Sequence, residues 1–323
     1  MTDANYPPQA DGRASTPLEV STVADLCAEI EANVAEVIVG HEDVIEHVVT
    51  AMFGRGHVLL DDVPGVGKTM LARSIATSID STFRRVQFTP DLLPTDVTGV
   101  NVFNQKTREF EFQPGPVFGN FVLADEINRA PAKTQSALLE AMEEAQVTVD
   151  GETRDLPEPF TVVATQNAVE PNQTYDLPFA ELDRFMKKLR LGYPDPEAEV
   201  ELLGRTVGEH PIETLEPVTD LETVVAARET VASVRVEEPL REYATRLVGY
   251  TREHARVGVS PRGTIALLRA AQARAATDGR DYVRPDDVRT EAPVVLPHRI
   301  KTTDRDRDGA TVVENALERV PVE

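Results

Sequence analysis

Short, mainly apolar runs alternate with segments of helical spacing over residues 18–193. The apolar runs lie at residues 58–60, 121–124 and 160–164, and each ends in polar residues. Helical spacing fills the intervals, as from Lys133 to Ala145. Buried strands that alternate with helices are typical of a parallel sheet with helices on both faces, and such sheets bind ligands at the carboxyl ends of their strands. We therefore predict an α/β domain over residues 18–193.

Two further segments of this domain have the pattern of β-hairpins. Residues 99–117 alternate polar and apolar positions on either side of a polar turn at 104–107, which predicts the first hairpin. The second is predicted around the Asp150-Gly151 turn.

The strand pattern ends near Pro194, and helical spacing then predicts a smaller all-α domain over residues 194–300. Its helices are expected at 197–208, 221–231, 239–253, 262–277 and 285–296. Residues 1–17 have no periodicity and are expected to form a disordered leader. Residues 301–323 are rich in Asp and Arg, so we expect a tail that adds little to the core.

A glycine-rich turn follows the first apolar run, where residues 58–69 read VLLDDVPGVGKT. A strand that is followed by a turn and then by the first turn of a helix presents backbone N–H groups to a phosphate. Lys68 is then expected to contact the β/γ-phosphates, and the Thr69 hydroxyl to take one Mg²⁺ position. The general pattern has glycine at position 62, where this chain has Asp, and the alternative is a corner whose glycines serve only the turn. The flanking strand and helix favour a nucleotide site, whose expected residues are Pro64, Gly65, Val66, Gly67, Lys68 and Thr69.

Carboxylates and an amide follow the next two buried runs. Asp125 and Glu126 end the run at 121–124, where one acid can support Mg²⁺ and the other can polarise the attacking water. The alternative is that they cap the following helix. Asn167 follows the run at 160–164 and is expected to hydrogen-bond the attacking water or the γ-phosphate, with a turn-capping amide as the alternative.

The charge of the chain is strongly negative. It has 55 Asp plus Glu against 33 Lys plus Arg, a net charge of −22, so nucleic acid is not expected as a partner. Only six of the cations are lysines and 27 are arginines. An acidic, lysine-poor surface is typical of proteins from very salty cytoplasm, where the Debye length is about 3 Å at 1 M salt. We therefore expect a halophilic source, an archaeon, with an ordinary aggregation-resistant acidic protein as the alternative.

The chain has no apolar run of about 18 residues and no secretory signal, so neither a membrane span nor export is expected. Cys27 is its one cysteine and cannot form an intrachain disulfide, which agrees with a reducing compartment. The expected location is the cytoplasm.

Several motifs together resemble the MoxR-type AAA+ ATPases of the helix-2-insert clade. The motifs are DDVPGVGKT at 61–69, DEINRAP at 125–131, LLEAMEE at 138–144, ATQN at 164–167, LDRF at 182–185 and SPR at 260–262. The likeness covers roughly residues 20–300, and the Asp at position 62 is similar to what this family carries. The resemblance implies a P-loop core with hairpin inserts and an all-α lid.

The resemblance also implies a role for each motif. Lys68 and Thr69 correspond to the Walker A pair, and Asp125 and Glu126 to the Walker B pair. Asn167 corresponds to sensor 1.

Other positions gain a role only through the resemblance. Arg184 looks like the arginine finger supplied to a neighbouring subunit's ATP, and Arg262 looks like sensor 2, which reaches the phosphates from the helical lid. Val39 and Gly40 look like the backbone segment beside the adenine. Arg129 is left as a candidate contact between subunits.

The implied function is a Mg²⁺-dependent ATPase that assembles as a homo-oligomeric ring, a hexamer, and remodels client proteins. The two hairpins would project toward the face or pore of that ring. Relatives often work with proteins that bear a von Willebrand factor A domain. The alternatives are the motor subunit of a metal chelatase and a nucleic-acid motor akin to MCM helicases. The last is disfavoured because the hairpins carry only Lys106, Arg108 and Arg154 as cations.

Overall fold

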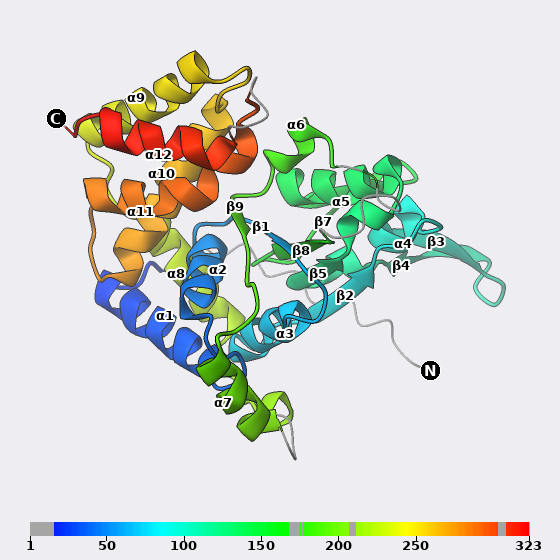
Figure 1. The fold of residues 1–323 in the computed structure, drawn as a ribbon. Helices are drawn as coiled ribbons and strands as arrows, with labels where there is room; N and C mark the ends of the chain where they lie inside the picture. The colour runs from blue at the N-terminus through cyan, green and yellow to red at the C-terminus, as the bar shows by residue number, and fades with distance from the viewer. Residues whose placement is uncertain (1–15, 168–174, 176, 207–210, 303–307, 323) are drawn as a thin grey trace.

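A five-stranded parallel sheet forms the centre of the computed structural model, which describes residues 16–167, 175, 177–206, 211–302 and 308–322 (Figure 1). The strand order is β2-β5-β8-β1-β9, and all neighbours are parallel. The strands are β1 (Val58–Asp62), β2 (Phe83–Gln87), β5 (Phe121–Asp125), β8 (Thr161–Asn167) and β9 (Lys187–Leu189). The predicted parallel sheet is confirmed, and the three-residue edge strand β9 was not predicted.

Helices cover both faces of this sheet, as its strands require. Leu60 of β1 packs in one hydrophobic cluster, with α1 to α3, whereas its neighbour Leu59 packs in the other, with α5. Successive side chains of a strand point to opposite faces, so a strand buried on both faces reads as a continuous apolar run. The helices of this part are α1 (Val20–Ala35), α2 (Glu42–Phe53), α3 (Lys68–Ser78), α4 (Pro94–Thr98), α5 (Ala132–Glu144) and α6 (Phe179–Leu182).

The helices that follow β9 form the predicted all-α part. They are α7 (Pro196–Thr206), α8 (Leu221–Ser233), α9 (Glu238–His254), α10 (Pro261–Thr277), α11 (Pro285–Val295) and α12 (Gly309–Arg319). Asp220, Ser260 and Asp308 start α8, α10 and α12, and each side chain accepts a backbone N–H of the first turn. The hydrophobic cluster of α1 to α3 continues into α8 to α12.

The expectation of a tail with little core is wrong at α12. Val312, Val313 and Ala316 are buried in the shared hydrophobic cluster. These three positions have the spacing of one face of a helix, but this short apolar pattern follows a polar stretch and was not recognised as a helix.

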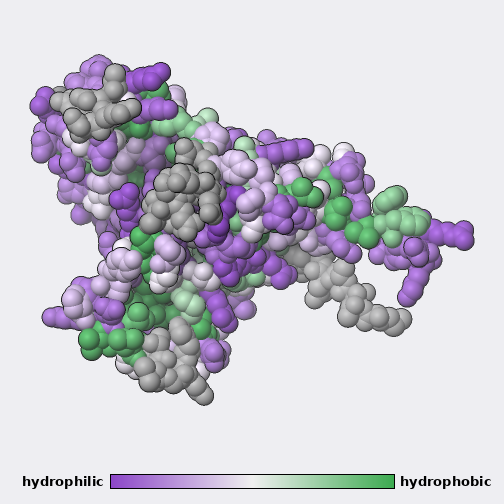
Figure 2. All heavy atoms as spheres, turned by 45° about the vertical axis from the view of Figure 1, so that its right-hand side comes forward, coloured by the Kyte–Doolittle hydropathy of each residue, from purple (hydrophilic) through white to green (hydrophobic). Residues whose placement is uncertain are grey.

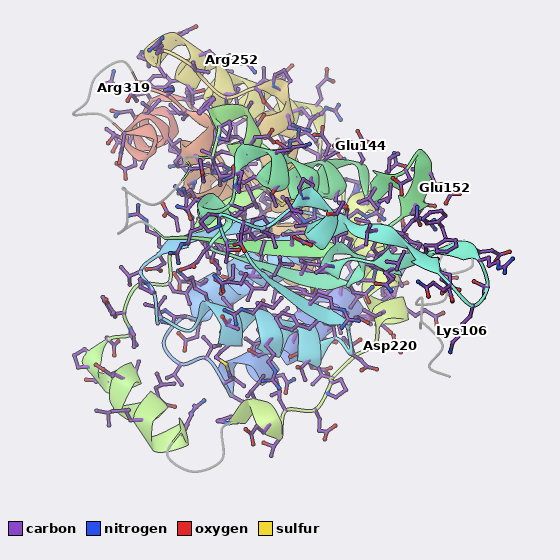
Figure 3. All side chains as sticks on the ribbon, turned by 90° about the vertical axis from the view of Figure 1, so that its right-hand side faces the viewer. Lys106, Glu144, Glu152, Asp220, Arg252 and Arg319 are labelled. Atoms are coloured by element: carbon purple, nitrogen blue, oxygen red, sulfur yellow. The ribbon has the colours of Figure 1, made fainter. Side chains whose placement is uncertain are left out.

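Both predicted hairpins are present and project from the same end of the molecule. The first consists of β3 (Gly99–Asn104) and β4 (Glu109–Pro114), and the second of β6 (Gln146–Val149) and β7 (Glu152–Asp155). Figure 3 shows Lys106 of the first and Glu152 of the second at this end. The hairpins touch each other, since Asn101 donates to Asp150 across 2.9 Å.

The first hairpin exposes aromatic rings on its projecting arm, where Figure 2 shows hydrophobic side chains. Phe103 is 50% exposed and Phe110 is 71% exposed, and their ring centroids lie 5.3 Å apart. Large apolar side chains that gather on a surface are typical of interaction sites.

A buried ionic cluster joins the sheet to the all-α part. Lys187 of β9 and Glu291 of α11 have fully buried side chains, and Lys187 Nζ lies 2.7 Å from Glu291 Oε2. Arg274 of α10 contacts the other oxygen, Oε1, at 2.9 Å. Burial alone would raise the pKa of Glu291, but the adjacent cations lower it from 4.5 to about 2. The stabilisation from this carboxylate is therefore complete above pH 4.5 and is lost as the pH falls toward 2.

We expect Glu291→Gln to lower the free energy of unfolding by about 3–5 kcal/mol, because Lys187 would keep a buried charge without its carboxylate. Urea denaturation at neutral pH measures this loss. Glu229→Gln is the matched control, because Glu229 pairs with Arg55 at the surface, where an ion pair contributes about 0–1 kcal/mol. Equal effects of the two variants would show that the buried cluster does not stabilise the fold.

Within the described residues, none of the helices combines the length and the apolar character that crossing a bilayer requires.

Candidate nucleotide site

The turn between β1 and α3 is shaped to bind an anion. Gly65 and Gly67 have φ of 86° and 94°, in the left-handed region that favours glycine. Among the described residues, no atom lies within 4 Å of where a Cβ would stand on either glycine. The backbone of the turn and the N-terminus of α3 therefore border open space, as a phosphate cradle requires.

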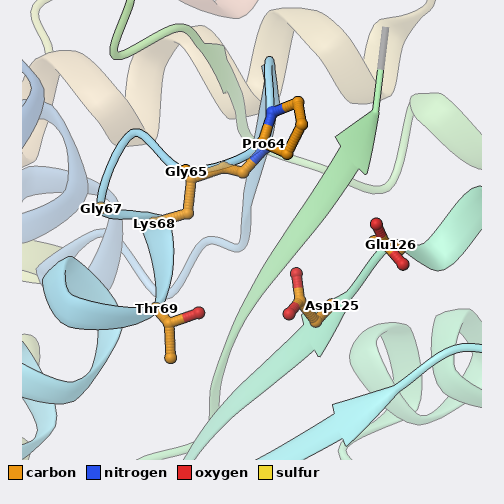
Figure 4. A pocket seen from close by; sticks show the side chains of 7 residues that line it. All are labelled: Pro64, Gly65, Gly67, Lys68, Thr69, Asp125 and Glu126. Carbon is orange, nitrogen blue, oxygen red and sulfur yellow. The ribbon is translucent and has the colours of Figure 1, made fainter. Parts of the chain in front are cut away.

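A pocket of about 190 Å³ lies over this turn (Figure 4). Its lining residues come from the turn, from the start of α3 and from the end of β5; they are Pro64, Gly65, Gly67, Lys68, Thr69, Asp125 and Glu126. Val66 contributes backbone to the turn, but its side chain packs in the hydrophobic core. The structure thus brings together two motifs that lie more than 50 residues apart in the sequence.

Lys68 folds back on its own loop. Its Nζ donates to the carbonyl oxygens of Asp62, at 3.0 Å, and Val63, at 3.1 Å. Burial lowers the pKa of Lys68, and the nearby carboxylates oppose that shift. A phosphate in the pocket offers the amine a charged partner in place of two carbonyls.

Both oxygens of Asp125 are engaged. Oδ1 accepts from the Thr165 hydroxyl at 2.6 Å, and Oδ2 accepts from Arg85 at 2.6 Å. The same Thr165 oxygen accepts the backbone N–H of Glu126 at 2.8 Å. Thr165 is fully buried, so this hydroxyl fixes the turn after β5.

The turn after β5 holds Glu126 in a conformation that is unusual for a residue with a side chain. Its φ is 54° and its ψ is 48°, a left-handed conformation that non-glycine residues adopt at a cost. Its Oε2 accepts from Gln87 at 2.7 Å and from Arg129 at 3.0 Å. Arg129 therefore contacts the Glu126 of its own chain.

Three residues of this network, Arg85, Gln87 and Thr165, were missed by sequence reasoning. Their contacts follow from strand register, since Gln87 pairs with Asp125 across β2 and β5. The available signal was that Arg85 and Gln87 are polar residues at alternate positions near the carboxyl end of β2.

The Thr69 hydroxyl and the Asp125 carboxylate are the candidate ligands for Mg²⁺. Thr69 and Asp125 face the same pocket, and the described residues include no group of three His, Cys, Asp or Glu side chains that could hold a metal ion. Mg²⁺ usually keeps several waters and binds through one or two protein groups plus substrate phosphates. The hydroxyl and the carboxylate fit a Mg²⁺ ion that arrives with a nucleotide.

Asn167, Val39 and Gly40 are three further residues of the predicted site. Asn167 ends β8, where its backbone pairs with Asp62, and its side chain lies outside the described residues. Val39 and Gly40 form the turn between α1 and α2. A Cβ on Gly40 would stand 2.6 Å from the Cβ of Ala198, so this turn packs against α7.

Arg184 and Arg262 converge on one carboxylate. Arg184 Nε lies 3.4 Å from Glu143 and 2.9 Å from Glu181, and the Arg262 guanidinium also bonds Glu143. The start of α10 is fixed there because Ser260 donates to Asp183 at 2.9 Å.

This arginine cluster lies at the edge of the sheet where the strands begin, opposite the carboxyl ends of the strands and the phosphate loop. His57 lies just before β1. Its backbone carbonyl oxygen accepts the N–H of Met186 at 2.8 Å, and its ring Nε2 lies 3.0 Å from the carbonyl oxygen of Met142. Arg184 and Glu143 therefore lie near the start of β1, whereas the loop follows its end, about 13 Å further along the strand. The expectation that Arg262 reaches the phosphates from the lid is corrected for its own chain, because the packing of α10 places Arg262 at this far edge.

Known proteins resemble this chain over most of its length. The model of the ATPase family associated with various cellular activities (AAA) matches residues 57–187, and that of an AAA lid domain matches residues 250–319, which include α12. YeaC of Bacillus subtilis is 55% identical over 270 residues, with 83% of this chain and 84% of that protein covered. The chaperone MoxR1 of Mycobacterium tuberculosis is 40% identical over 308 residues, with 92% of this chain and 79% of that protein covered.

Solved structures agree with the observed fold. A Cytophaga hutchinsonii protein inferred to be an ATPase superposes with a TM-score of 0.88 at 38% identity, and 94% of this chain and 97% of that chain are covered. An MCM homolog from Methanopyrus kandleri has a TM-score of 0.58 at 20% identity, with 97% and 63% covered, and shares the fold alone. With its phosphate loop, its strand-end carboxylates and these relatives, the chain belongs to the MoxR family of AAA+ ATPases.

Proposed function

We propose that this protein is a Mg²⁺-dependent ATPase that works as a ring and uses ATP hydrolysis to remodel client proteins. The observation that carries the proposal is a divided site. One sheet edge presents a phosphate loop with two carboxylates, and the opposite edge presents two arginines. A single chain cannot bring both edges to one nucleotide, whereas neighbours in a ring can.

In this proposal, individual residues have separate parts in the activity. Lys68 binds the β/γ-phosphates, and Glu126 accepts a proton from the attacking water while Asn167 orients that water. Thr69 and Asp125 would hold Mg²⁺, which would supply positive charge to the phosphates. Hydrogen bonds from Gln87 and Arg129 hold the Glu126 carboxylate in position.

Both arginines of the far edge serve the neighbouring subunit in this proposal. A hexamer is the ring that we propose. Each guanidinium would exchange its contact with Glu143 for a phosphate of the adjoining subunit. The chain carries a net charge of −22, so these cations and Lys68 must reverse the local field around a triphosphate.

Lys68→Ala is expected to weaken ATP binding by about 10- to 150-fold, since a hydrogen bond to a charged group contributes about 1.5–3 kcal/mol. Binding of a fluorescent ATP analogue and steady-state hydrolysis with Mg²⁺ or with a chelator test the proposal. Lys133→Ala, at an exposed position of α5, is the matched control. Unchanged binding in Lys68→Ala, or hydrolysis that is indifferent to the chelator, would contradict it.

The projecting hairpins support a protein client. The exposed Phe103 and Phe110 offer an apolar contact, and the relative from M. tuberculosis is named as a chaperone. A partner with a von Willebrand factor A domain belongs to the same proposal. A chelatase motor is the second candidate, because a magnesium-chelatase subunit ChlI homolog of Methanocaldococcus jannaschii is 26% identical over 193 residues.

Two more detailed assignments belong to the same proposal. The hairpin between α4 and β5 supports membership of the helix-2-insert clade. The excess of acids and the scarcity of lysines support a halophilic, archaeal source. A melting temperature that did not rise from low to molar salt would contradict the halophilic assignment.

A further inference from the structure

Asp62, the residue that departs from the general phosphate-loop pattern, joins the loop to a distant segment. Its carboxylate is buried at the end of β1. Oδ1 accepts the N–H of Val63 at 2.7 Å, and Oδ2 accepts the N–H groups of Leu191 at 2.6 Å and Gly192 at 2.7 Å. Leu191 and Gly192 lie in the linker between β9 and α7. One side chain therefore binds the loop and the linker together.

The linker is shaped to receive this carboxylate. Gly192 has a φ of 71°, in the left-handed region. Two successive N–H groups that point at one oxygen form a concave anion site of the kind called a nest. The neighbouring Asp61 adds an ion pair with Lys188 of β9 at 2.7 Å, so two acids at the end of β1 hold β9 and the chain that leaves it.

The main chain of Asp62 has a second partner, the lysine of the phosphate loop. Lys68 Nζ donates to the carbonyl oxygen of Asp62 at 3.0 Å. If Lys68 moves toward a bound phosphate, its bond to this carbonyl would lengthen or break, and the backbone at position 62 would be free to shift. The carboxylate of the same residue stays bound to the linker, so a displacement at position 62 reaches Leu191 and Gly192 directly.

The linker leads into α7, which is mainly exposed and is held to the end of α1 by Arg205, whose guanidinium donates to the carbonyl oxygens of Ala35 at 2.7 Å and Glu36 at 3.0 Å. Ala198 of α7 packs against Gly40, whereas Val200 and Leu203 of the same helix are 70% and 57% exposed. A helix with little buried surface can move at low cost. A shift of the linker is therefore expected to move α7.

We infer that Asp62 is a positioning residue that couples occupancy of the phosphate loop to the position of the linker and of α7. This inference rests on the proposed nucleotide binding. It also explains why an aspartate stands where the general pattern has glycine, because glycine has no side chain with which to bind the linker. Asp62→Gly restores the general phosphate-loop pattern and removes both the contact with the linker and the local bond to the N–H of Val63.

Fluorescence energy transfer between labels on α5 and α7 tests the inference in the full chain. Lys133→Cys and Glu199→Cys provide exposed labelling sites, and Cys27 stays unlabelled because it is buried and its pKa is raised by burial. The ligands are Mg²⁺-ADP and a non-hydrolysable Mg²⁺-ATP analogue, and their affinity is measured separately on each variant.

In the unmodified background, we expect the ATP analogue to change the transfer efficiency. In Asp62→Gly we expect less than half of that change, with affinity altered less than about tenfold. Its kcat should fall while its KM stays near the wild-type value, a change that a residue needed only for the stability of the fold would not produce.

Asp62→Asn keeps the shape of the side chain and one acceptor oxygen. Its change in transfer efficiency should be intermediate, and this variant replaces Asp62→Gly in the test if the glycine variant does not fold. Asp220→Asn is the control, because Asp220 accepts a backbone N–H at the start of α8, remote from the loop.

The possible results separate the two proposals. A full transfer change in Asp62→Gly, or bound analogue without any change in the unmodified background, overturns the coupling role while nucleotide binding stands. Failure of the unmodified protein to bind either nucleotide overturns the proposed function and the coupling with it.

Discussion

Arg184→Ala is expected to form rings that bind ATP and hydrolyse it about 10³–10⁵ times more slowly than wild type. In the proposed role, the guanidinium stabilises the negative charge that develops on the phosphates of the neighbouring subunit's ATP during transfer. In the isolated chain this group is held by Glu181 and Glu143, at the sheet edge opposite its own pocket. Steady-state hydrolysis, nucleotide affinity and size-exclusion chromatography together measure the effect.

Arg55→Ala is the matched control for this variant, because Arg55 is also an arginine in an ion pair but lies at the surface with Glu229. We expect its turnover to equal that of wild type. Normal turnover in Arg184→Ala would show that the finger is assigned wrongly. Because a monomer lacks the neighbour's arginine, wild-type activity should also rise faster than linearly with protein concentration.

Glu126→Gln is expected to keep ATP binding and to lower turnover by about 10²–10⁴-fold. Glutamine has nearly the same shape and can still accept from Gln87 and Arg129, but its amide cannot take a proton from water. Single-turnover hydrolysis and retention of labelled ATP measure this. Glu144→Gln, at the exposed end of α5, is the control and should be fully active. A Glu126→Gln variant that releases product at the wild-type rate would remove Glu126 from the reaction.

The same variant gives access to the client. Rings that hold ATP without turnover should keep a bound client long enough for recovery. Recovery that depends on ATP and is lost when Phe103 and Phe110 are replaced by alanine would support the hairpin as its contact.

The buried strands and the phosphate loop could be predicted because their signals are local. β1 and β5 are covered on both faces, so each is a continuous apolar run that ends in polar residues. The carboxyl ends of parallel strands share one edge of the sheet. That rule alone is enough to place Asp125 and Glu126 at the same edge as Lys68.

The rest of the site depends on contacts between residues that are far apart in the sequence, which no local sequence pattern predicts. Thr165 reaches Asp125 through the alignment of β5 with β8, and Gln87 reaches Glu126 from β2. The place of Arg262 depends on how α10 packs against Asp183, which couples residues from two distant parts of the chain. β9, with three residues, is too short to show a periodicity.

If each ATP site is built from two chains, two inactive variants should restore activity to each other when they are mixed in one ring. In a ring that contains both Arg184→Ala and Glu126→Gln subunits, some pockets pair an intact Glu126 with the intact Arg184 of a neighbour. We predict that the mixture hydrolyses ATP well above the sum of the two separate variants. Hydrolysis equal to that sum, in rings shown to contain both subunits, would contradict the account.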